Sequence, residues 1–170
     1  GRREKRQLVK GKIHRQLTPS MERYRRVFEA LGFSAEAQFS GYAPIDATPI
    51  VAAKQPGERW VAVAPFSQHR GKEYPLSLME KVVAQLTEME GVGVLLFGGG
   101  EKEKQALHPF TQKFEHTISV AEIPHSFADE LALMQQCDVM LSMDSANMHL
   151  ASVVNLPVVS VWGATHPYCG

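Results

Sequence analysis

The chain has 170 residues, of which 44% are hydrophobic, and its 18 basic residues balance 18 acidic ones. This length allows one domain with a sizeable buried core, or one domain with an appendage, and a net charge of zero argues against a polyanionic partner for the whole chain. No apolar run approaches the roughly 18 residues that a membrane span needs, and the charged start lacks the apolar stretch of a signal peptide, so we expect a soluble protein.

Positive charge is concentrated at the start of the chain. Residues 1–26 contain ten basic and two acidic residues, a local charge of +8 that the remaining residues balance. Such a segment fits a solvated arm, a contact with an anionic membrane or a contact with nucleic acid. The first 17 residues show no clear hydrophobic period.

A helix is predicted over residues 18–33. Thr18 is the expected cap, Pro19 the first helical position and Gly32 the stop. Apolar residues recur at spacings of three and four and form one stripe: Met21, Tyr24, Val27, Phe28 and Leu31. Residues 34–58, with three prolines and little period, read as a linker that has room for a short strand.

From Trp60 onward, short apolar runs alternate with helical stretches. We predict strands at residues 60–66, 91–98, 117–120, 137–143 and 157–163. The predicted helices lie between them, at residues 74–90, 101–114, 126–136 and 145–154. The strands are continuously hydrophobic, which is typical of parallel strands covered on both faces. The fold class is therefore α/β: a Rossmann-like, doubly wound parallel sheet of about five strands.

Polar residues gather in the loops that follow these strands, where such sheets bind ligands. The strongest signal is "MDSANMHLA": Asp144 and Ser145 lie where a strand gives way to a helix, and helix-end amides there suit a phosphate. Asn147 and His149 can face the same site. The alternative is that Asp144 or Ser145 simply caps the helix, and that His149 is a core residue.

Two other loops carry weaker signals. In "PFSQHRGKEYP", the cations His69, Arg70 and Lys72 suit a phosphate, and Ser67 can add a hydroxyl donor. The alternative is that these are ordinary solvated charges of a surface loop. In "GGGEKEKQ", three glycines precede Glu101, whose carboxylate can accept from ribose hydroxyls, but a plain tight turn is equally consistent. Cys137 and Cys169 have no metal-ligand spacing and indicate a reducing compartment.

The stretch "SMDSANMHLASVVNLPVVSVWGATHP" resembles the signature of glycosyltransferase family 9, the ADP-heptose:lipopolysaccharide heptosyltransferases. The matching features are Asp144-Ser145, His149, Ala151, the Pro157–Val159 strand start, and Gly163 with Thr165. Lys72 near Pro75, and Gly98–Gly100 followed by Glu101, resemble two further loops of the family, so the likeness covers residues 59–170. Ala146 stands where the family has Gly, and Glu73-Tyr74-Pro75 replaces its usual Trp-Pro.

The resemblance implies the C-terminal half of a two-domain GT-B glycosyltransferase. Residues 1–33 would be the tail end of the N-terminal acceptor domain, 34–58 the interdomain linker, and 59–170 the nucleotide-sugar domain, truncated at its C-terminus. The implied donor-binding residues are Ser67, Lys72, Glu101, Asp144, Ser145, Ala146 and His149. Asp144, Ser145 and Ala146 would meet the diphosphate, Lys72 would neutralise it, Glu101 would bind the ribose and His149 would line the site.

The resemblance also implies a function. It is an inverting transfer of heptose or a related sugar from an ADP-sugar to the lipopolysaccharide inner core, with no metal or other cofactor. The general base would be an Asp of the N-terminal domain, so we expect this chain to bind donor without efficient turnover. The implied location is the cytoplasm, peripheral to the inner membrane. A non-catalytic nucleotide-binding module, a UDP-sugar-dependent GT-B enzyme and a nucleic-acid binder are the alternatives.

Overall fold

The computed structural model describes residues 2–34, 36 and 38–169. It divides the chain into two compact units: residues 1–40 with 162–170, and residues 41–161. Residues 162–170, which the sequence analysis counts with the nucleotide-sugar domain, thus group with the N-terminal unit.

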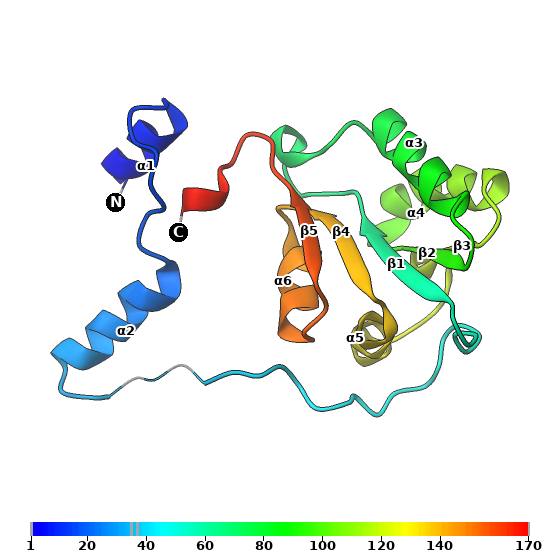
Figure 1. Cartoon of the computed structure of the whole chain (residues 1–170), viewed down its shortest axis with the longest axis horizontal. Helices are drawn as coiled ribbons and strands as arrows, with labels where there is room; N and C mark the ends of the chain where they lie inside the picture. The colour runs from blue at the N-terminus through cyan, green and yellow to red at the C-terminus, as the bar shows by residue number, and fades with distance from the viewer. Residues whose placement is uncertain (1, 35, 37, 170) are drawn as a thin grey trace. The chain divides into compact units, whose positions relative to one another are not determined.

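The larger unit is built on a five-stranded parallel sheet with the order β3-β2-β1-β4-β5 (Figure 1). The strands are β1 (Arg59–Ala64), β2 (Val92–Leu96), β3 (Thr117–Ser119), β4 (Val139–Met143) and β5 (Val158–Val161). Its α-helices are α3 (Leu76–Thr87), α4 (Gly100–Lys113), α5 (Phe127–Gln136) and α6 (Ala146–Val153). The predicted α/β class, with its five strands and four intervening helices, is confirmed.

Alternation along β1 divides the core into two clusters, one on each face of the sheet. Val63 packs with α3 and α4, whose buried contributions include Met79 and Leu107. Ala62 and Ala64 face the opposite cluster, which α5 and α6 complete. Both faces are therefore covered, which explains why the strands read as continuous apolar runs.

The strand order reverses at β1. The chain passes from β1 to β2 and β3 on one side, and then returns to place β4 directly beside β1. In open parallel sheets, such a reversal leaves a crevice at the carboxyl ends of the two adjacent strands. The loops after β1 and β4 therefore meet at this point.

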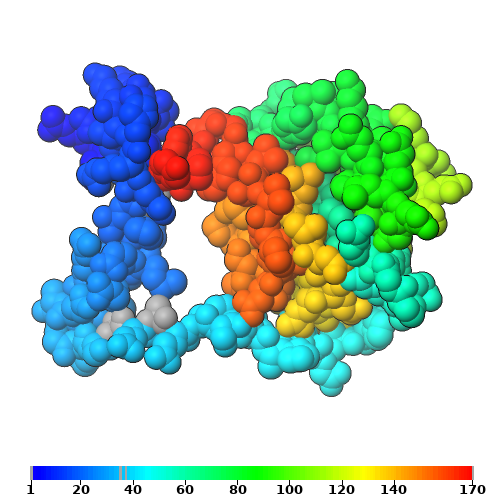
Figure 2. All heavy atoms as spheres, in the orientation of Figure 1, coloured from blue at the N-terminus to red at the C-terminus, as the bar shows by residue number. Residues whose placement is uncertain are grey.

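Residues 41–58 run in extended form along the unit but contain no strand, so the short strand allowed in the linker is absent from these residues. The Ile45 amide donates to Gln135 Oε1 (2.9 Å), and the Thr48 amide to Asp129 Oδ1 (3.1 Å), both on α5. In Figure 2 the segment lies against the lower edge of the unit. Side-chain acceptors of α5 thus take the place of a neighbouring strand.

The smaller unit contains α1 (Arg2–Val9), α2 (Ser20–Ala30) and a 3-10 turn, η3 (Pro167–Cys169). Residues 1–17 show no hydrophobic period, so the sequence does not predict α1. Leu8 and Leu17 are buried, and the Leu17 amide donates to the Tyr168 carbonyl oxygen at 2.9 Å. These contacts tie the two ends of the chain together within this unit.

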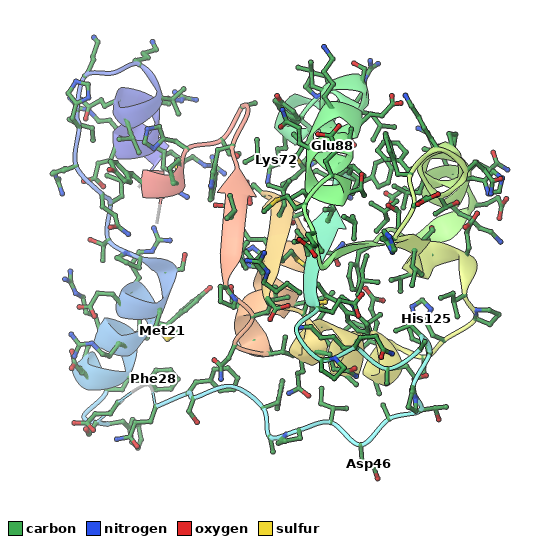
Figure 3. All side chains as sticks on the ribbon, turned by 45° about the vertical axis from the view of Figure 1, so that its right-hand side comes forward. Met21, Phe28, Asp46, Lys72, Glu88 and His125 are labelled. Carbon is green, nitrogen blue, oxygen red and sulfur yellow. The ribbon has the colours of Figure 1, made fainter. Side chains whose placement is uncertain are left out.

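Helix α2 confirms the predicted helix, but Pro19 rather than Thr18 occupies the N-cap position. Its apolar stripe is more than half exposed at every position: Met21, Tyr24, Val27, Phe28 and Leu31. Figure 3 shows Met21 and Phe28 on this helix. No described helix is both long and apolar enough to cross a membrane.

Asp138 anchors the extended segment to the start of β1. Its Oδ2 accepts hydrogen bonds from the Trp60 amide (2.6 Å) and from Lys54 Nζ, while its own amide donates to the Trp60 carbonyl oxygen (2.9 Å). Burial opposes ionisation, but the hydrogen bonds from Lys54 and Trp60 outweigh it and hold the pKa of the Asp138 carboxyl below its usual value.

We predict that Asp138→Asn destabilises the fold in a pH-dependent way. Because the folded pKa is lowered, the carboxylate stabilises the fold above its unfolded pKa of about 3.9 and ceases to do so as the pH falls through the folded value. With a side chain that is 44% exposed, screening limits the loss at pH 7 to about 1 kcal/mol. Urea unfolding at pH 7 and below pH 3 measures this. If the difference in unfolding free energy between the variant and the unchanged chain does not shrink in acid, the account is contradicted. The control is Asp46→Asn, which changes an exposed aspartate.

Candidate functional site

A cavity of about 430 Å³ lies at the carboxyl ends of β1 and β4, where the strand order reverses. It is lined by Phe66, Ser67, Gln68, His69, Lys72, Glu103, Asp144, Ser145, Ala146, Asn147 and His149. Six of the seven predicted donor-binding residues line this cavity, and Glu101 does not. Residues from three loops, far apart in sequence, therefore share one site.

An ion pair joins the loops that follow β1 and β4. Lys72, in the 3-10 turn η1 (Arg70–Lys72), places Nζ 2.7 Å from Asp144 Oδ2, and the two side chains are only 24% and 14% exposed. Lys72 Nζ also lies 3.5 Å from the Asp144 carbonyl oxygen, to which Ser67 Oγ donates at 3.3 Å. Figure 3 shows Lys72 at this edge of the sheet. The contacts hold a cation at the cavity wall.

The first turn of α6 also lines the cavity. Ser145 occupies the N-cap position, yet its side chain makes no capping hydrogen bond. Instead, its Oγ lies 3.2 Å from Oγ of Ser142, a fully buried residue whose hydroxyl donates to the Met143 carbonyl oxygen. A capping hydrogen bond therefore does not account for the position of the Ser145 side chain. The amide-rich, positive end of α6 borders the cavity, as an anion site requires.

Ala146 and His149 follow on the same helix and also line the cavity. Ala146 is the first residue of α6, so its methyl group lies beside the helix-end amides. His149, one turn later, lies at the cavity rather than in the core. The alternative reading of His149 as a core residue is thus not observed.

Glu103, rather than Glu101, reaches the cavity from the glycine-rich turn. Glu103 Oε2 accepts from the Gly99 amide at 2.7 Å, whereas exposed Glu101 accepts from Gln105 Nε2 at 2.9 Å on the outer surface of α4. Gly100 opens α4 with φ +71°, a conformation that favours glycine. Two residues along a helix turn a side chain by about 200°, so the start of α4 decides which Glu faces the cavity.

Sequence reasoning missed Phe66, Gln68 and Glu103 as lining residues. Phe66 and Gln68 carry no chemical pattern of their own, and only their place in the loop after β1 brings them to the cavity. Glu103 had a readable signal, because a carboxylate in the first turn of a helix can accept from amides at its start. Across the described residues, no group of three or more His, Cys, Asp or Glu is placed to hold a metal ion.

The sheet order, the two helical layers and the cavity at the reversal define a Rossmann-like domain. Residues 4–169 match the family described as glycosyltransferase family 9 (heptosyltransferase), and the chain belongs to this family. No curated protein sequence matches the chain.

Solved structures of heptosyltransferases share the fold. Escherichia coli WaaC with ADP has a TM-score of 0.68 at 16% identity, over 91% of this chain and 49% of WaaC. WaaC with ADP-2-deoxy-2-fluoro heptose gives 0.67 at 17% identity, over 92% and 49%. The E. coli ADP-heptose lipopolysaccharide heptosyltransferase II gives 0.58 at 19% identity, over 91% and 40%. The chain thus spans about half the length of WaaC.

Proposed function

We propose that this chain is the donor-binding half of a heptosyltransferase that uses an ADP-sugar and builds the lipopolysaccharide inner core. The observation that carries this proposal is the contact of Lys72 with Asp144, the residue before the N-cap of α6, at one cavity. A cation beside a helix N-terminus suits a diphosphate. Membership of the family, and the ADP ligands named for WaaC, support the donor class.

The diphosphate would lie between Lys72 and the first turn of α6. There the Ser145 hydroxyl and the amides of Ser145 and Ala146 are positioned to donate hydrogen bonds to phosphate oxygens. The methyl group of Ala146 leaves the phosphate less room to approach the helix-end amides than the Gly of the family would. His149 would line the donor site, and Ser67 would hold the loop through Asp144.

The ribose would lie toward the glycine-rich turn. We assign the ribose-accepting carboxylate to Glu103, since Glu103 borders the cavity and the sequence candidate Glu101 does not. Its Oε2 is already fixed by the Gly99 amide, which leaves Oε1 to accept from the ribose hydroxyls.

In the proposed reaction, an acceptor hydroxyl attacks the anomeric carbon from the face opposite the diphosphate, the bond to the diphosphate oxygen breaks, and the configuration inverts. Lys72 and the α6 dipole stabilise the negative charge that develops on the leaving diphosphate. The hydroxyl proton must pass to a general base. The family resemblance assigns that base to an Asp of the N-terminal domain, so we expect this chain alone to bind donor without efficient turnover.

We predict that this chain binds ADP and ADP-heptose more tightly than UDP or UDP-glucose in calorimetric titrations. Lys72→Ala should weaken ADP binding about tenfold or more, because a charge-assisted contact to phosphate is lost. Lys81→Ala, an exposed lysine of α3 outside the cavity, should leave the affinity unchanged. Affinities for ADP compounds no higher than those for UDP compounds would contradict this assignment, and tighter binding of UDP compounds would favour a UDP-sugar enzyme. ADP binding without sugar transfer by a chain joined to its N-terminal domain would favour a non-catalytic module.

The two glutamates of the glycine-rich turn form a matched pair. Glu103→Gln should weaken ADP binding about fivefold, because a neutral amide is a poorer acceptor for ribose hydroxyls than a carboxylate. Glu101→Gln makes the same chemical change two residues away and should have no effect. The reverse result in the same titration would restore Glu101 as the ribose residue.

We also propose that the smaller unit contacts the cytoplasmic face of the inner membrane. The exposed apolar stripe of α2 and the local charge of +8 in residues 1–26 are the features of a helix that lies in an anionic interface. Glu22, whose charge is already included in this sum, contacts both Arg25 and Arg26, and Arg25 also contacts Glu29.

We predict that the chain sediments with phosphatidylglycerol-containing vesicles and does so less as salt rises, because surface charge attraction is screened. Phe28→Asp should reduce the bound fraction severalfold, since it places a carboxylate within the apolar stripe. Met89→Asp alters an equally exposed residue of the larger unit and serves as the control. Equal binding to neutral phosphatidylcholine vesicles, or an unchanged Phe28→Asp variant, would refute the proposal.

A further inference from the structure

Ser142 is a fully buried residue near the carboxyl end of β4. In the parallel register it lies between Ala64 of β1 and Ser160 of β5, and it does not line the donor cavity. A buried hydroxyl costs free energy unless it finds hydrogen-bond partners. The partners of Ser142 lie where β4 gives way to α6: the Met143 carbonyl oxygen at 3.0 Å and Ser145 Oγ at 3.2 Å.

The number of protons among these three groups decides which hydroxyl donates to the other. A serine hydroxyl has one proton and two lone pairs, whereas a carbonyl oxygen only accepts. Because Ser142 donates its proton to the Met143 carbonyl oxygen, the contact between the two hydroxyls must use the Ser145 proton. Ser145 therefore donates to the buried residue and keeps only lone pairs for a group that enters the cavity.

A phosphate requires the opposite arrangement. Its oxygens accept, so Ser145 can bind one only by turning its proton away from Ser142. The contact between the two hydroxyls is longer than the roughly 2.8 Å that such groups prefer, and a charged oxygen is the stronger acceptor, so this turn is favourable.

Ser142 can follow this turn without any movement of heavy atoms. Its hydroxyl rotates from the Met143 carbonyl oxygen to Ser145 Oγ, which is already within reach. No O–H bond breaks, and the bond given up is the one to Met143. A hydroxyl that accepts a hydrogen bond also donates a stronger one, so Ser142 would strengthen the contact of Ser145 with phosphate.

Ser142 also accounts for the absence of a cap at α6. Ser145 has φ −141° and ψ 177°, the extended conformation from which an N-cap serine usually accepts from an amide of the first turn. Its side chain makes no such bond and contacts Ser142 instead. The Ser145 side chain therefore does not compete with an anion for those amides.

We propose that Ser142 is a positioning residue for the donor diphosphate. It holds the Ser145 side chain away from the capping position, and its hydroxyl turns to Ser145 Oγ when Ser145 donates to phosphate. The proposal rests on the proposed function, because it places Ser142 behind the same diphosphate site. Ser142 itself would touch no ligand.

Calorimetric titration of ADP into a double-mutant cycle tests this proposal. Ser142→Ala removes one buried oxygen atom, and Ser145→Ala removes the hydroxyl that would meet phosphate. We expect each variant to weaken ADP binding about fivefold, and the double variant to bind no more than about twofold more weakly than Ser145→Ala alone. The matched control is Ser119→Ala, because Ser119 is a buried serine of β3 whose hydroxyl has no hydrogen-bond partner among the described residues. Its ADP affinity should not change.

Three results would overturn the role of Ser142: an unchanged ADP affinity in Ser142→Ala, losses that add in the double variant, or an equal loss in Ser119→Ala. If the unchanged chain does not bind ADP, the proposed function fails, and the Ser145 side chain still decides the role of Ser142. Three-bond couplings between the Hα and Hβ protons of Ser145 should show one χ1 rotamer in the unchanged chain, and a different or averaged rotamer in Ser142→Ala. Identical couplings in both chains would refute the positioning role.

Discussion

The direct pairing of β1 with β4 is the constraint on which the site depends. Val61 to Ala64 of β1 lie in parallel register with Val139 to Ser142 of β4, so the two strands end at the same edge. Because the chain leaves β1 toward β2 and β3 and then returns to β4 on the other side, the loops that follow β1 and β4 border a crevice. The sheet thereby places Lys72 beside the N-terminal end of α6.

The Lys72–Asp144 ion pair gives this crevice its electrostatic character. The two groups are mostly shielded from water, and a shielded ion pair contributes little net stability because desolvation offsets the attraction. Its main consequence is geometric, since Asp144 holds the ammonium group at the cavity before any anion enters. An incoming diphosphate would then share Lys72 with a carboxylate whose loop is already in place, which limits the ordering cost of binding.

The sequence predicts the sheet well, because strands buried on both faces must be apolar throughout, and helices that cover them must carry an apolar stripe. Six of the seven candidate binding residues line one cavity for a related reason: loops at strand ends meet wherever the order of a parallel sheet reverses. The local sequence pattern gave the wrong residue where a shift of one or two positions decides which way a side chain points. The choice between Glu101 and Glu103 depends on where α4 begins, which periodicity does not fix to one residue.

Other differences have tertiary causes. Helix α1 has few apolar residues and no sequence period to reveal it, and only Leu8 is buried. The apolar stripe of α2 predicts a buried face, yet that face is exposed. Hydrophobic periodicity shows that a helix is amphipathic, but it does not show which other part of the protein covers the apolar face. In residues 41–58, the Ile45 and Thr48 amides donate to side chains of α5 and not to a neighbouring strand. No residue pattern in the sequence predicts this arrangement.

The central claim is that a nucleoside diphosphate binds between the loop after β1 and the first turn of α6. A backbone amide chemical-shift map of the isotopically labelled chain, with and without ADP, tests it most directly. The account predicts that the largest shifts fall in residues 66–72, 99–103 and 144–149, and that they shrink severalfold in Lys72→Ala at an ADP concentration near the Kd of the unchanged chain. Shifts concentrated in residues 2–30, or shifts that persist unchanged in Lys72→Ala, would contradict it.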